Sequence, residues 1–335
     1  TSFDKWGQRL CFINFGQHRY LQFRQPAIGA DHRHRRLGGD DHATGFVTVK
    51  AFAQLIKFRL TASVAATSVF GYILGCKLNA DGDWKSLFDW VTFSGVLIGG
   101  MLVVFASNGL NQIIEKENDG KMTRTAQRPI VEERISLSQA ITFCWITGIL
   151  GMLILSFTTP FVAVFLSGLS LVMYVFVYTP MKQTTNMSVM IGAIPGALPP
   201  LIGYTAVVGR IDEPGMMLFL VQFFWQFPHF WSIAWLLHDD YQKAGYWLLP
   251  SSGGRDKKSG YQILTYTVLL IIISMTPIYY GMAGPKSLIL ILPMSIWLLM
   301  KSVNLFRSLE IPDARKLLYA TLVYTPLVFL GYIIF

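Results

Sequence analysis

The sequence predicts an all-α protein that crosses a membrane about nine times. Hydrophobic residues make up 53% of the 335 residues and charged residues only 14%, whereas soluble globular proteins carry about 25% charged residues. Apolar stretches of near-spanning length recur along the chain from residue 59 onward. Because backbone groups cannot remain unpaired in lipid, such stretches must form helices.

The expected helices cover residues 59–76, 91–112, 138–157, 161–179, 187–208, 215–237, 262–283, 285–304 and 316–335. Each is close to the ~20 residues that a bilayer requires. The fifth stretch contains IGAIPGALPP at 191–200, and Gly and Pro are tolerated in membrane helices that pack closely on their neighbours. We therefore expect a kinked, tightly packed helix at this position and not a loop.

Residues 1–45 have a different composition. They are polar and rich in Arg and His, with no helical or alternating pattern and no apolar core of a secretory signal. We interpret 1–45 as a disordered or non-native N-terminal extension and 46–335 as one polytopic membrane domain. Cys11, Cys76 and Cys144 share no motif spacing, so the sequence supports neither a disulfide framework nor a zinc site.

The distribution of basic residues predicts the orientation in the membrane. If the residues before the first helix are cytoplasmic and the helices alternate in direction, most Lys and Arg fall in cytoplasmic loops. The opposite side then holds only Lys77, Lys85, Arg210 and Lys286. This asymmetry predicts a cytoplasmic N-terminus and an external C-terminus, which in a bacterium places the protein in the cytoplasmic (inner) membrane.

Oxygen-bearing side chains gather where the second expected helix ends. Asn111, Glu115 and Asp119 follow one another at intervals of four, and four-residue steps stay near one helix face, drifting about 40° each time. Hard oxygen ligands suit Mg²⁺, which takes one or two protein carboxylates and completes its shell with phosphate and water. We predict that these three residues are catalytic and bind Mg²⁺. The alternative is a solvated loop of mixed charge.

Basic residues follow directly at Lys121, Arg124 and Arg128. Lys and Arg are the residue types that neutralise and clamp a diphosphate, so we predict that these three bind substrate. Acidic ligands followed by a basic cluster therefore indicate a metal–diphosphate site.

Two further clusters follow the fourth and sixth expected helices. Tyr178 and Lys182 form the first, and Asp239, Asp240 and Lys243 form the second. Alternating topology brings these loops to the same surface as the first acidic cluster, across a cavity that opens on the cytoplasmic side. We predict substrate binding by Tyr178, Lys182 and Lys243, a catalytic role for the two aspartates, and metal binding by Asp240. Alternatively, the two aspartates are an ordinary helix end.

His229 lies inside the sixth expected helix, near Trp231. Histidine at membrane depth is costly and tends to be functional, so we predict that both residues contact substrate. The alternatives are a histidine satisfied by a backbone carbonyl or a neighbouring hydroxyl, and an aromatic stripe that serves packing or an interfacial belt. The aromatic residues of this stretch are Phe223, Phe224, Trp225, Phe227, Phe230, Trp231 and Trp235.

Taken in order along residues 46–335, several segments resemble those of the UbiA-type membrane prenyltransferases. Three departures are Glu115, where that family usually has Asp, Lys57-Phe58-Arg59, which lacks a proline before the first helix, and Gln183, where a basic residue is common. The matching segments are Asn111-x-x-x-Glu115-x-x-x-Asp119, Lys121-Met122-x-Arg124-Thr125-x-x-Arg128-Pro129, Tyr178-Thr179-Pro180-x-Lys182, Pro199-Pro200-Leu201-Ile202-Gly203, His229-Phe230-Trp231, and Asp240-Tyr241-x-x-Ala244-Gly245.

The resemblance implies a UbiA-like helical bundle and a Mg²⁺-assisted ionisation of an allylic diphosphate. The segments are most similar to the heme-farnesylating branch of the family. That branch implies transfer of farnesyl from farnesyl diphosphate to the vinyl group of heme B, which gives heme O and diphosphate. It also implies a lipid bilayer and either heme A synthase or a terminal-oxidase assembly as partners, without nucleic acid.

Two alternatives remain open at the level of sequence. The same scaffold could prenylate a quinone-precursor or chlorophyll-type acceptor, although the segments around His229 and Asp240 favour heme. A membrane protein with broken helices could also be a transporter, which would be expected to carry charges deep inside the bundle. The charges here gather at one surface instead.

Overall fold

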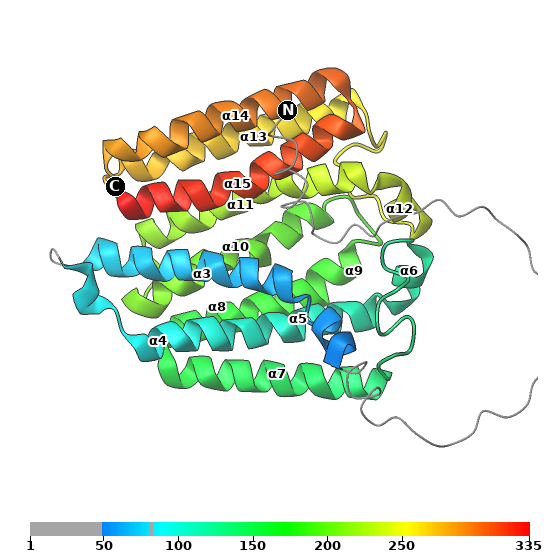
Figure 1. The fold of residues 1–335 in the computed structure, drawn as a ribbon, viewed down its shortest axis with the longest axis horizontal. Helices are drawn as coiled ribbons and strands as arrows, with labels where there is room; N and C mark the ends of the chain where they lie inside the picture. The colour runs from blue at the N-terminus through cyan, green and yellow to red at the C-terminus, as the bar shows by residue number, and fades with distance from the viewer. Residues whose placement is uncertain (1–48, 81–82) are drawn as a thin grey trace, which may run out of the picture. The chain divides into compact units, whose positions relative to one another are not determined.

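A computed structural model describes residues 49–80 and 83–335, and these ranges contain helices and turns but no β-strand. The chain divides into two units, Thr1–Asp41 and His42–Phe335, so every described residue belongs to the second unit. The predicted extension, 1–45, lies outside the described residues. The all-α prediction is confirmed for the part of the chain that the structure describes (Figure 1).

The first half of this unit follows a helical segment at residues 49–55. Its elements are α3 (Phe58–Asn79), η1 (Trp84–Leu87), α4 (Trp90–Ser94), η2 (Gly95–Gly99), α5 (Gly100–Ile114), α6 (Lys116–Lys121), α7 (Leu137–Thr158), α8 (Phe161–Val172), η3 (Met173–Tyr178) and α9 (Thr179–Met181). The elements α4, η2 and α5 follow one another without a break, as do α8, η3 and α9; η2 and η3 are π-helical turns.

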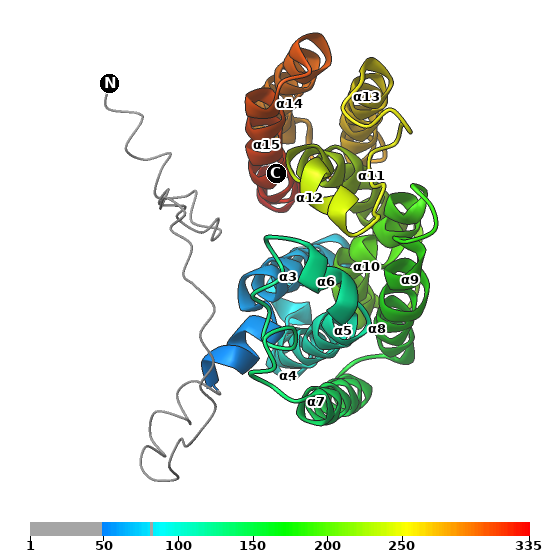
Figure 2. The ribbon, with the colours of Figure 1, turned by 90° about the vertical axis from the view of Figure 1, so that its right-hand side faces the viewer.

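The second half consists of long helices joined by short connections. Its elements are α10 (Ser188–Val208), α11 (Glu213–Leu236), α12 (His238–Lys243), α13 (Lys257–Tyr279), η4 (Pro285–Ser287), α14 (Leu288–Ser308) and α15 (Ile311–Ile334). Figure 1 shows the short helices α6 and α12 at the same end of the bundle, and Figure 2 looks onto that end. We refer to it as the α6–α12 end.

Eight helices in the described ranges are long and apolar enough to cross a membrane. Each coincides with one of the expected stretches. The remaining stretch, 215–237, forms α11, which has 24 residues but is not among the eight. Gln222, Gln226 and His229 make this helix more polar than the others. The eight spans make the protein an integral membrane protein, and α11 is a ninth helix of similar length.

Polar caps fix several helix starts. Ser136 and Gln139 form a reciprocal capping box at the start of α7. The carboxylates of Asp212 and Asp256 accept backbone N–H groups at the starts of α11 and α13. Such caps satisfy donors that have no partner inside the helix, and each stabilises its helix by about 1 kcal/mol.

The Pro- and Gly-rich stretch forms one continuous helix, α10, which packs against α3 (Figure 2). A Cβ atom at Gly203 would lie 1.8 Å from the backbone oxygen of Ser68, and one at Gly71 would lie 1.9 Å from that of Pro200. Only glycine permits this approach of the two backbones. The expectation of a tightly packed helix is confirmed. Helix α10 is therefore a central element against which α3, α8 and α11 pack.

The segment before α3 is anchored to α5 by amide side chains. Gln112 Nε2 donates to the backbone oxygen of Leu55 at 2.7 Å, and Asn108 Nδ2 donates to that of Ile56 at 3.2 Å. Leu55 is fully buried. These contacts hold Lys57, the next residue, beside the end of α5.

Candidate active site

The predicted ligands Asn111, Glu115 and Asp119 lie on one continuous helical face. Glu115 joins α5 to α6 with φ −90° and ψ 6°, yet the helical hydrogen bonding runs through it. Its N–H donates to the Asn111 oxygen at 3.0 Å, and the Asp119 N–H donates to the Glu115 oxygen at 2.8 Å. All three residues are buried, with exposed fractions of 1%, 3% and 0%. The prediction that they share a face is confirmed, whereas a solvated loop would expose them.

Asn111 connects the end of α5 to two other elements. Its Nδ2 donates to Thr179 Oγ1 at 3.1 Å, and its Oδ1 accepts from Lys57 Nζ at 3.4 Å. Thr179 follows the π-helical turn η3, and its hydroxyl donates to the backbone oxygen of Tyr174, five residues earlier. π-Helical turns are rare and are frequent at functional sites. Here η3 precedes both Thr179 and Lys182.

Glu115 forms a buried ion pair with Lys182. Lys182 Nζ donates to Glu115 Oε1 at 2.7 Å, and the two side chains are 11% and 4% exposed. The same ammonium lies 4.6 Å from the centre of the Tyr178 ring. Burial alone would raise the pKa of Glu115, but Lys182, with Lys57 and Arg128, holds that pKa below its usual value. Glu115 is therefore an ionised carboxylate, and the predicted site residues Tyr178 and Lys182 contact each other beside it.

Asp119 pairs with Arg128 through its Oδ2 atom. Its other oxygen, Oδ1, is buried and has no hydrogen-bond partner. Burial raises the pKa of Asp119 above its usual value, although Arg128 acts in the opposite direction. A buried carboxylate oxygen without a partner costs free energy that a cation or a donor would recover. This atom is the clearest sign that the site accepts a ligand.

Lys57 is a site residue that the sequence alone did not identify. Besides Asn111, its ammonium lies near Glu115, Asp119, Arg128 and Lys182. Burial, together with the positive charges of Arg128 and Lys182, lowers its pKa well below the usual value. The available signal was a basic residue just before the first spanning helix, which also marks membrane orientation.

The second acidic cluster anchors the loop that carries Arg128. Asp240, on α12, accepts the backbone N–H of Thr123 at 2.8 Å and that of Arg124 at 3.2 Å. Lys243 Nζ donates to Asp240 at 3.0 Å and to Thr123 Oγ1 at 2.7 Å. Inside the loop, Thr125 donates to the backbone oxygen of Asp119 at 2.8 Å. The structure thus brings the two clusters together, with Asp240 bound to loop backbone.

Asp239 lies apart from this arrangement. Both of its oxygens accept from Arg255 Nη1 at 3.1 Å, and its side chain is 75% exposed. Two other predicted site residues are also exposed. Lys121 donates to Asn118 at 3.1 Å, and Arg124 lies 5.9 Å from the Tyr241 ring centre. The structure does not bring these three side chains to Asn111, Glu115 and Asp119.

On α11, His229 and Trp231 face different neighbours. His229 Nδ1 lies 2.9 Å from Thr321 Oγ1 on α15. Trp231 is 3% exposed and packs edge-on against Tyr266 of α13, with ring centres 5.0 Å apart. Trp231 therefore belongs to the main hydrophobic core. Its contacts match the packing alternative, and the contact of His229 with the Thr321 hydroxyl matches the alternative of a histidine satisfied by a neighbouring hydroxyl.

The donor chemistry of the buried set fits Mg²⁺. The amide oxygen of Asn111, the Glu115 carboxylate and the unpartnered Asp119 Oδ1 are all hard oxygen atoms. Within the described ranges, no three His, Cys, Asp or Glu side chains are grouped closely enough to hold a metal ion by themselves. Mg²⁺ typically binds one or two protein carboxylates and completes its coordination with phosphate and water.

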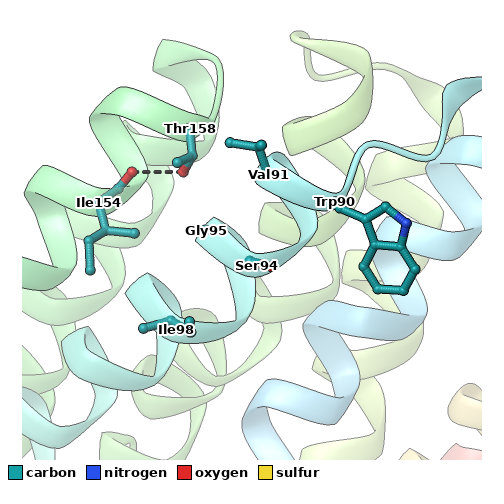
Figure 3. Close-up of a pocket in the computed structure, with 7 residues that line it drawn as sticks. All are labelled: Trp90, Val91, Ser94, Gly95, Ile98, Ile154 and Thr158. Atoms are coloured by element: carbon teal, nitrogen blue, oxygen red, sulfur yellow. Dashed lines mark hydrogen bonds between the residues drawn. The ribbon is translucent and has the colours of Figure 1, made fainter.

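A groove of about 460 Å³ lies elsewhere, between α4–η2 and α7 (Figure 3). It is apolar, and its hydrogen bond from Thr158 Oγ1 to the Ile154 oxygen stays within α7. The lining residues are Trp90, Val91, Ser94, Gly95, Ile98, Ile154 and Thr158. None of them is a predicted site residue, so this groove is not the predicted cavity at the α6–α12 end.

A bundle of membrane helices with buried carboxylates and cations at one end is suited to an enzyme that acts on a charged, phosphorylated lipid substrate. The chain belongs to the UbiA prenyltransferase family, which matches residues 83–328, and it is therefore a prenyltransferase. This membership excludes the transporter alternative. It also agrees with the resemblance seen in the sequence.

Curated relatives cover nearly the same length. The protoheme IX farnesyltransferase of Cytophaga hutchinsonii is 40% identical over 286 residues, which is 85% of this chain and 97% of the relative. The protein of the same name from Christiangramia forsetii is 39% identical over 84% of this chain and 92% of its own length. A third, from Solibacter usitatus, is 33% identical over 84% and 97%.

Solved structures confirm the fold. One of digeranylgeranylglyceryl phosphate synthase has a TM-score of 0.70 and 21% identity, covering 86% of this chain and 98% of that one. A UbiA homologue from Archaeoglobus fulgidus, bound to GPP and Mg²⁺, has a TM-score of 0.57 and 13% identity, covering 84% and 99%. At these identities the likeness establishes the UbiA-like bundle and nothing about substrates.

Proposed function

We propose that this protein transfers the farnesyl group of farnesyl diphosphate to a vinyl group of heme B, with a hydroxyl added from water, giving heme O and diphosphate. The observation that carries the proposal is the buried set at the α6–α12 end, where Asp119 keeps one oxygen without a partner beside the basic residues Lys57, Arg128 and Lys182. The name of the curated relatives, protoheme IX farnesyltransferase, supports the choice of donor and acceptor.

In this proposal Asn111, Glu115 and Asp119 hold Mg²⁺. An ion held there would supply positive charge to the diphosphate leaving group. The Archaeoglobus fulgidus homologue binds Mg²⁺ together with GPP, which supports the same pairing here. Asp240 has a different role, because its oxygens bind the backbone of the Arg128 loop and Lys243.

Lys57, Lys182 and Arg128 bind the diphosphate. Arg128 and Lys182 are paired with Asp119 and Glu115, and Lys57 adds a third basic side chain whose charged form a bound diphosphate would favour. Fixed charges in a buried site need little reorganisation when the negative charge develops on the leaving group. Burial also keeps water from the allylic cation that forms when the C–O bond breaks.

The acceptor site is proposed around His229. This imidazole lies on α11 within the helical bundle, and an imidazole nitrogen is a common heme ligand. A quinone-type acceptor contains no iron and needs no such ligand. The partly buried aromatic residues Trp225 and Phe230 flank the ring, with centres 4.5 Å and 5.7 Å from its own, and they would form apolar walls for a porphyrin.

We further propose that the α6–α12 end faces the cytoplasm of a bacterial cell and that the protein lies in the inner membrane. The basic residues of the loops at this end, including Lys116 and Arg134, support that orientation by the positive-inside rule. Farnesyl diphosphate is water-soluble at its charged end, so the site would receive it from the cytoplasmic surface. Heme A synthase and terminal-oxidase assemblies are proposed partners because they consume heme O.

The test is an assay of the purified protein with farnesyl diphosphate, Mg²⁺ and heme B. Asp119→Asn removes the carboxylate to which the unpartnered oxygen belongs. Asp239→Asn removes an exposed carboxylate outside the buried set. The proposal expects farnesylated heme from the wild type and from Asp239→Asn, and almost none from Asp119→Asn. Prenylation of a hydroxybenzoate, without prenylation of heme, would support the quinone-precursor alternative instead.

A further inference from the structure

His229 is enclosed by two residues that are not among the predicted site residues. Thr321, on α15, is fully buried, and its Oγ1 lies 2.9 Å from His229 Nδ1. Trp225, one turn before His229 on α11, stacks its indole on the imidazole with ring centres 4.5 Å apart and planes 17° apart. The Trp225 Nε1–H donates to the backbone oxygen of Thr321 at 2.7 Å. The three residues form a closed set that joins α11 to α15.

The hydrogen bonds of Thr321 determine which imidazole nitrogen carries the proton. Thr321 Oγ1 donates its single proton to the backbone oxygen of Leu318 at 2.6 Å. A hydroxyl that has donated its proton can only accept from a second partner. His229 Nδ1 must therefore be the donor in the 2.9 Å contact. In a neutral imidazole this leaves Nε2 without a proton and with a free lone pair.

The two contacts also fix the orientation of the ring. The bond to Thr321 sets the rotation of the imidazole about its axis, and the indole of Trp225 covers one of its faces. Since Trp225 is itself bonded to the backbone of Thr321, a displacement of one residue disturbs the other. In a ligating histidine, the N–H of the second ring nitrogen usually donates a hydrogen bond to an oxygen atom, which fixes both the tautomer and the direction of the ring.

We propose that Thr321, supported by Trp225, is a positioning residue that presents the unprotonated Nε2 of His229 to the iron of heme B. This inference rests on the proposed function, because it takes heme as the acceptor. Heme is substrate here, so Thr321 tunes acceptor binding and does not touch the diphosphate end of the reaction. The loss of the Thr321 hydroxyl lets the imidazole rotate or place its proton on Nε2, which prevents ligation.

The experiment is a titration of the full-length protein in detergent with heme B, followed by absorbance. Thr321→Val removes the hydroxyl and keeps the shape, and Thr321→Ser keeps the hydroxyl. Thr325→Val is the matched control, since Thr325 lies one turn further along α15, is 3% exposed, and has an Oγ1 without a partner. Binding of a non-hydrolysable farnesyl diphosphate analogue is measured in parallel, with thermal stability as the check on folding.

The proposal expects Thr321→Val to bind heme about 10- to 100-fold more weakly, as second-layer changes at metal ligands do. Its heme spectrum should also lose the signature of imidazole ligation. Thr321→Ser and Thr325→Val should bind heme like the wild type, and all variants should bind the diphosphate analogue normally. Trp225→Phe, which keeps a ring but loses the bond to Thr321, should change the spectrum in the same direction and serves if Thr321→Val does not fold.

Two results would overturn the inference alone. In the first, Thr321→Val keeps the heme spectrum and the heme affinity of the wild type, while His229→Ala loses heme binding. In the second, Thr321→Ser binds heme as poorly as Thr321→Val. A wild-type protein that binds the diphosphate analogue but gives no heme spectrum would overturn the proposed heme acceptor as well. The two failures are therefore distinguishable.

Discussion

Arg128 contacts one carboxylate oxygen of Asp119 and leaves the other, Oδ1, buried without a hydrogen-bond partner. An unsatisfied buried acceptor costs about 1–3 kcal/mol. Other hydrogen bonds hold Asp119 in this position despite the cost. Thr125 donates to the Asp119 backbone, and Asp240 binds the backbone of the loop that carries Arg128. The free oxygen thus points to a ligand that arrives with the substrate, which in our proposal is Mg²⁺ with a diphosphate.

Asp119→Asn keeps the size of the side chain and removes its charge. We expect the farnesyl-transfer rate at saturating Mg²⁺ to fall at least about 100-fold, the usual effect of deleting one electrostatic contact to a developing charge. Asp239→Asn, which alters an exposed residue paired with Arg255, should retain the wild-type rate. Equal rates in Asp119→Asn and the wild type would remove Asp119 from the metal site.

Lys57→Met tests the site residue that the sequence did not reveal. Because the Lys57 ammonium is buried beside Asn111, its loss should weaken binding of farnesyl diphosphate by about 2–5 kcal/mol. Lys121→Met is the matched control, since Lys121 is exposed and its ammonium donates to Asn118 instead of to the buried set. Isothermal titration with a non-hydrolysable analogue measures both. A loss of affinity in the control equal to that in Lys57→Met would contradict the assignment.

The Glu115–Lys182 pair should contribute to stability as well as to binding. Lys182→Met leaves the Glu115 carboxylate buried without its partner, and removing one member of a buried pair typically costs about 3–5 kcal/mol. We expect a clear decrease in the thermal midpoint of the protein in detergent.

The double variant Glu115→Gln/Lys182→Met provides the control for that prediction. It removes both charges, so the midpoint should recover towards that of the wild type while farnesyl transfer remains absent. If Lys182→Met has the same thermal midpoint as the wild type, the ion pair does not contribute to the stability of the protein.

Asp240→Asn separates loop anchoring from metal binding. Its carboxylate binds the backbone N–H groups of Thr123 and Arg124, so its loss should loosen the Arg128 loop and raise the KM for farnesyl diphosphate about tenfold, with a nearly unchanged Mg²⁺ requirement. If Asp240 instead binds metal, as the sequence analysis predicted, the Mg²⁺ concentration needed for the half-maximal rate should increase strongly. Titration of Mg²⁺ at saturating substrate distinguishes the two roles.

The orientation in the membrane can be tested with fusions. A reporter joined near Ser252, after α12, should be active in the cytoplasm, and one joined near Asp212, before α11, should be external. The reason is the excess of Lys and Arg in the loops at the α6–α12 end. The opposite result at either point would reverse the orientation and move the site to the external surface.

The acidic face could be predicted from sequence because it is local. Asn111, Glu115 and Asp119 are separated by four residues, and helical periodicity alone places them together. The membrane-spanning helices could also be predicted from sequence, because a continuous apolar run of spanning length has few other possible structures. Polarity within α11 is what sets that helix apart from the other eight.

The remainder of the site depends on tertiary contacts that spacing does not encode. Asp239 and Asp240 are adjacent, yet one bonds to Arg255 and the other to the loop after α6. Trp231 lies two positions from His229, which on a helix is a different face, and it packs in the core. Lys57 enters the site only because Gln112 and Asn108 hold the preceding segment against α5.

The most direct test of the account is mass spectrometry of the hemes extracted from cells that express the protein, compared with cells that express Asp119→Asn at equal abundance. The account predicts that the wild type accumulates heme O, identified by a heme B mass increased by one farnesyl group and one hydroxyl group, and that the variant does not. Heme B unchanged by the wild-type protein, together with a farnesylated product from another acceptor, would contradict it.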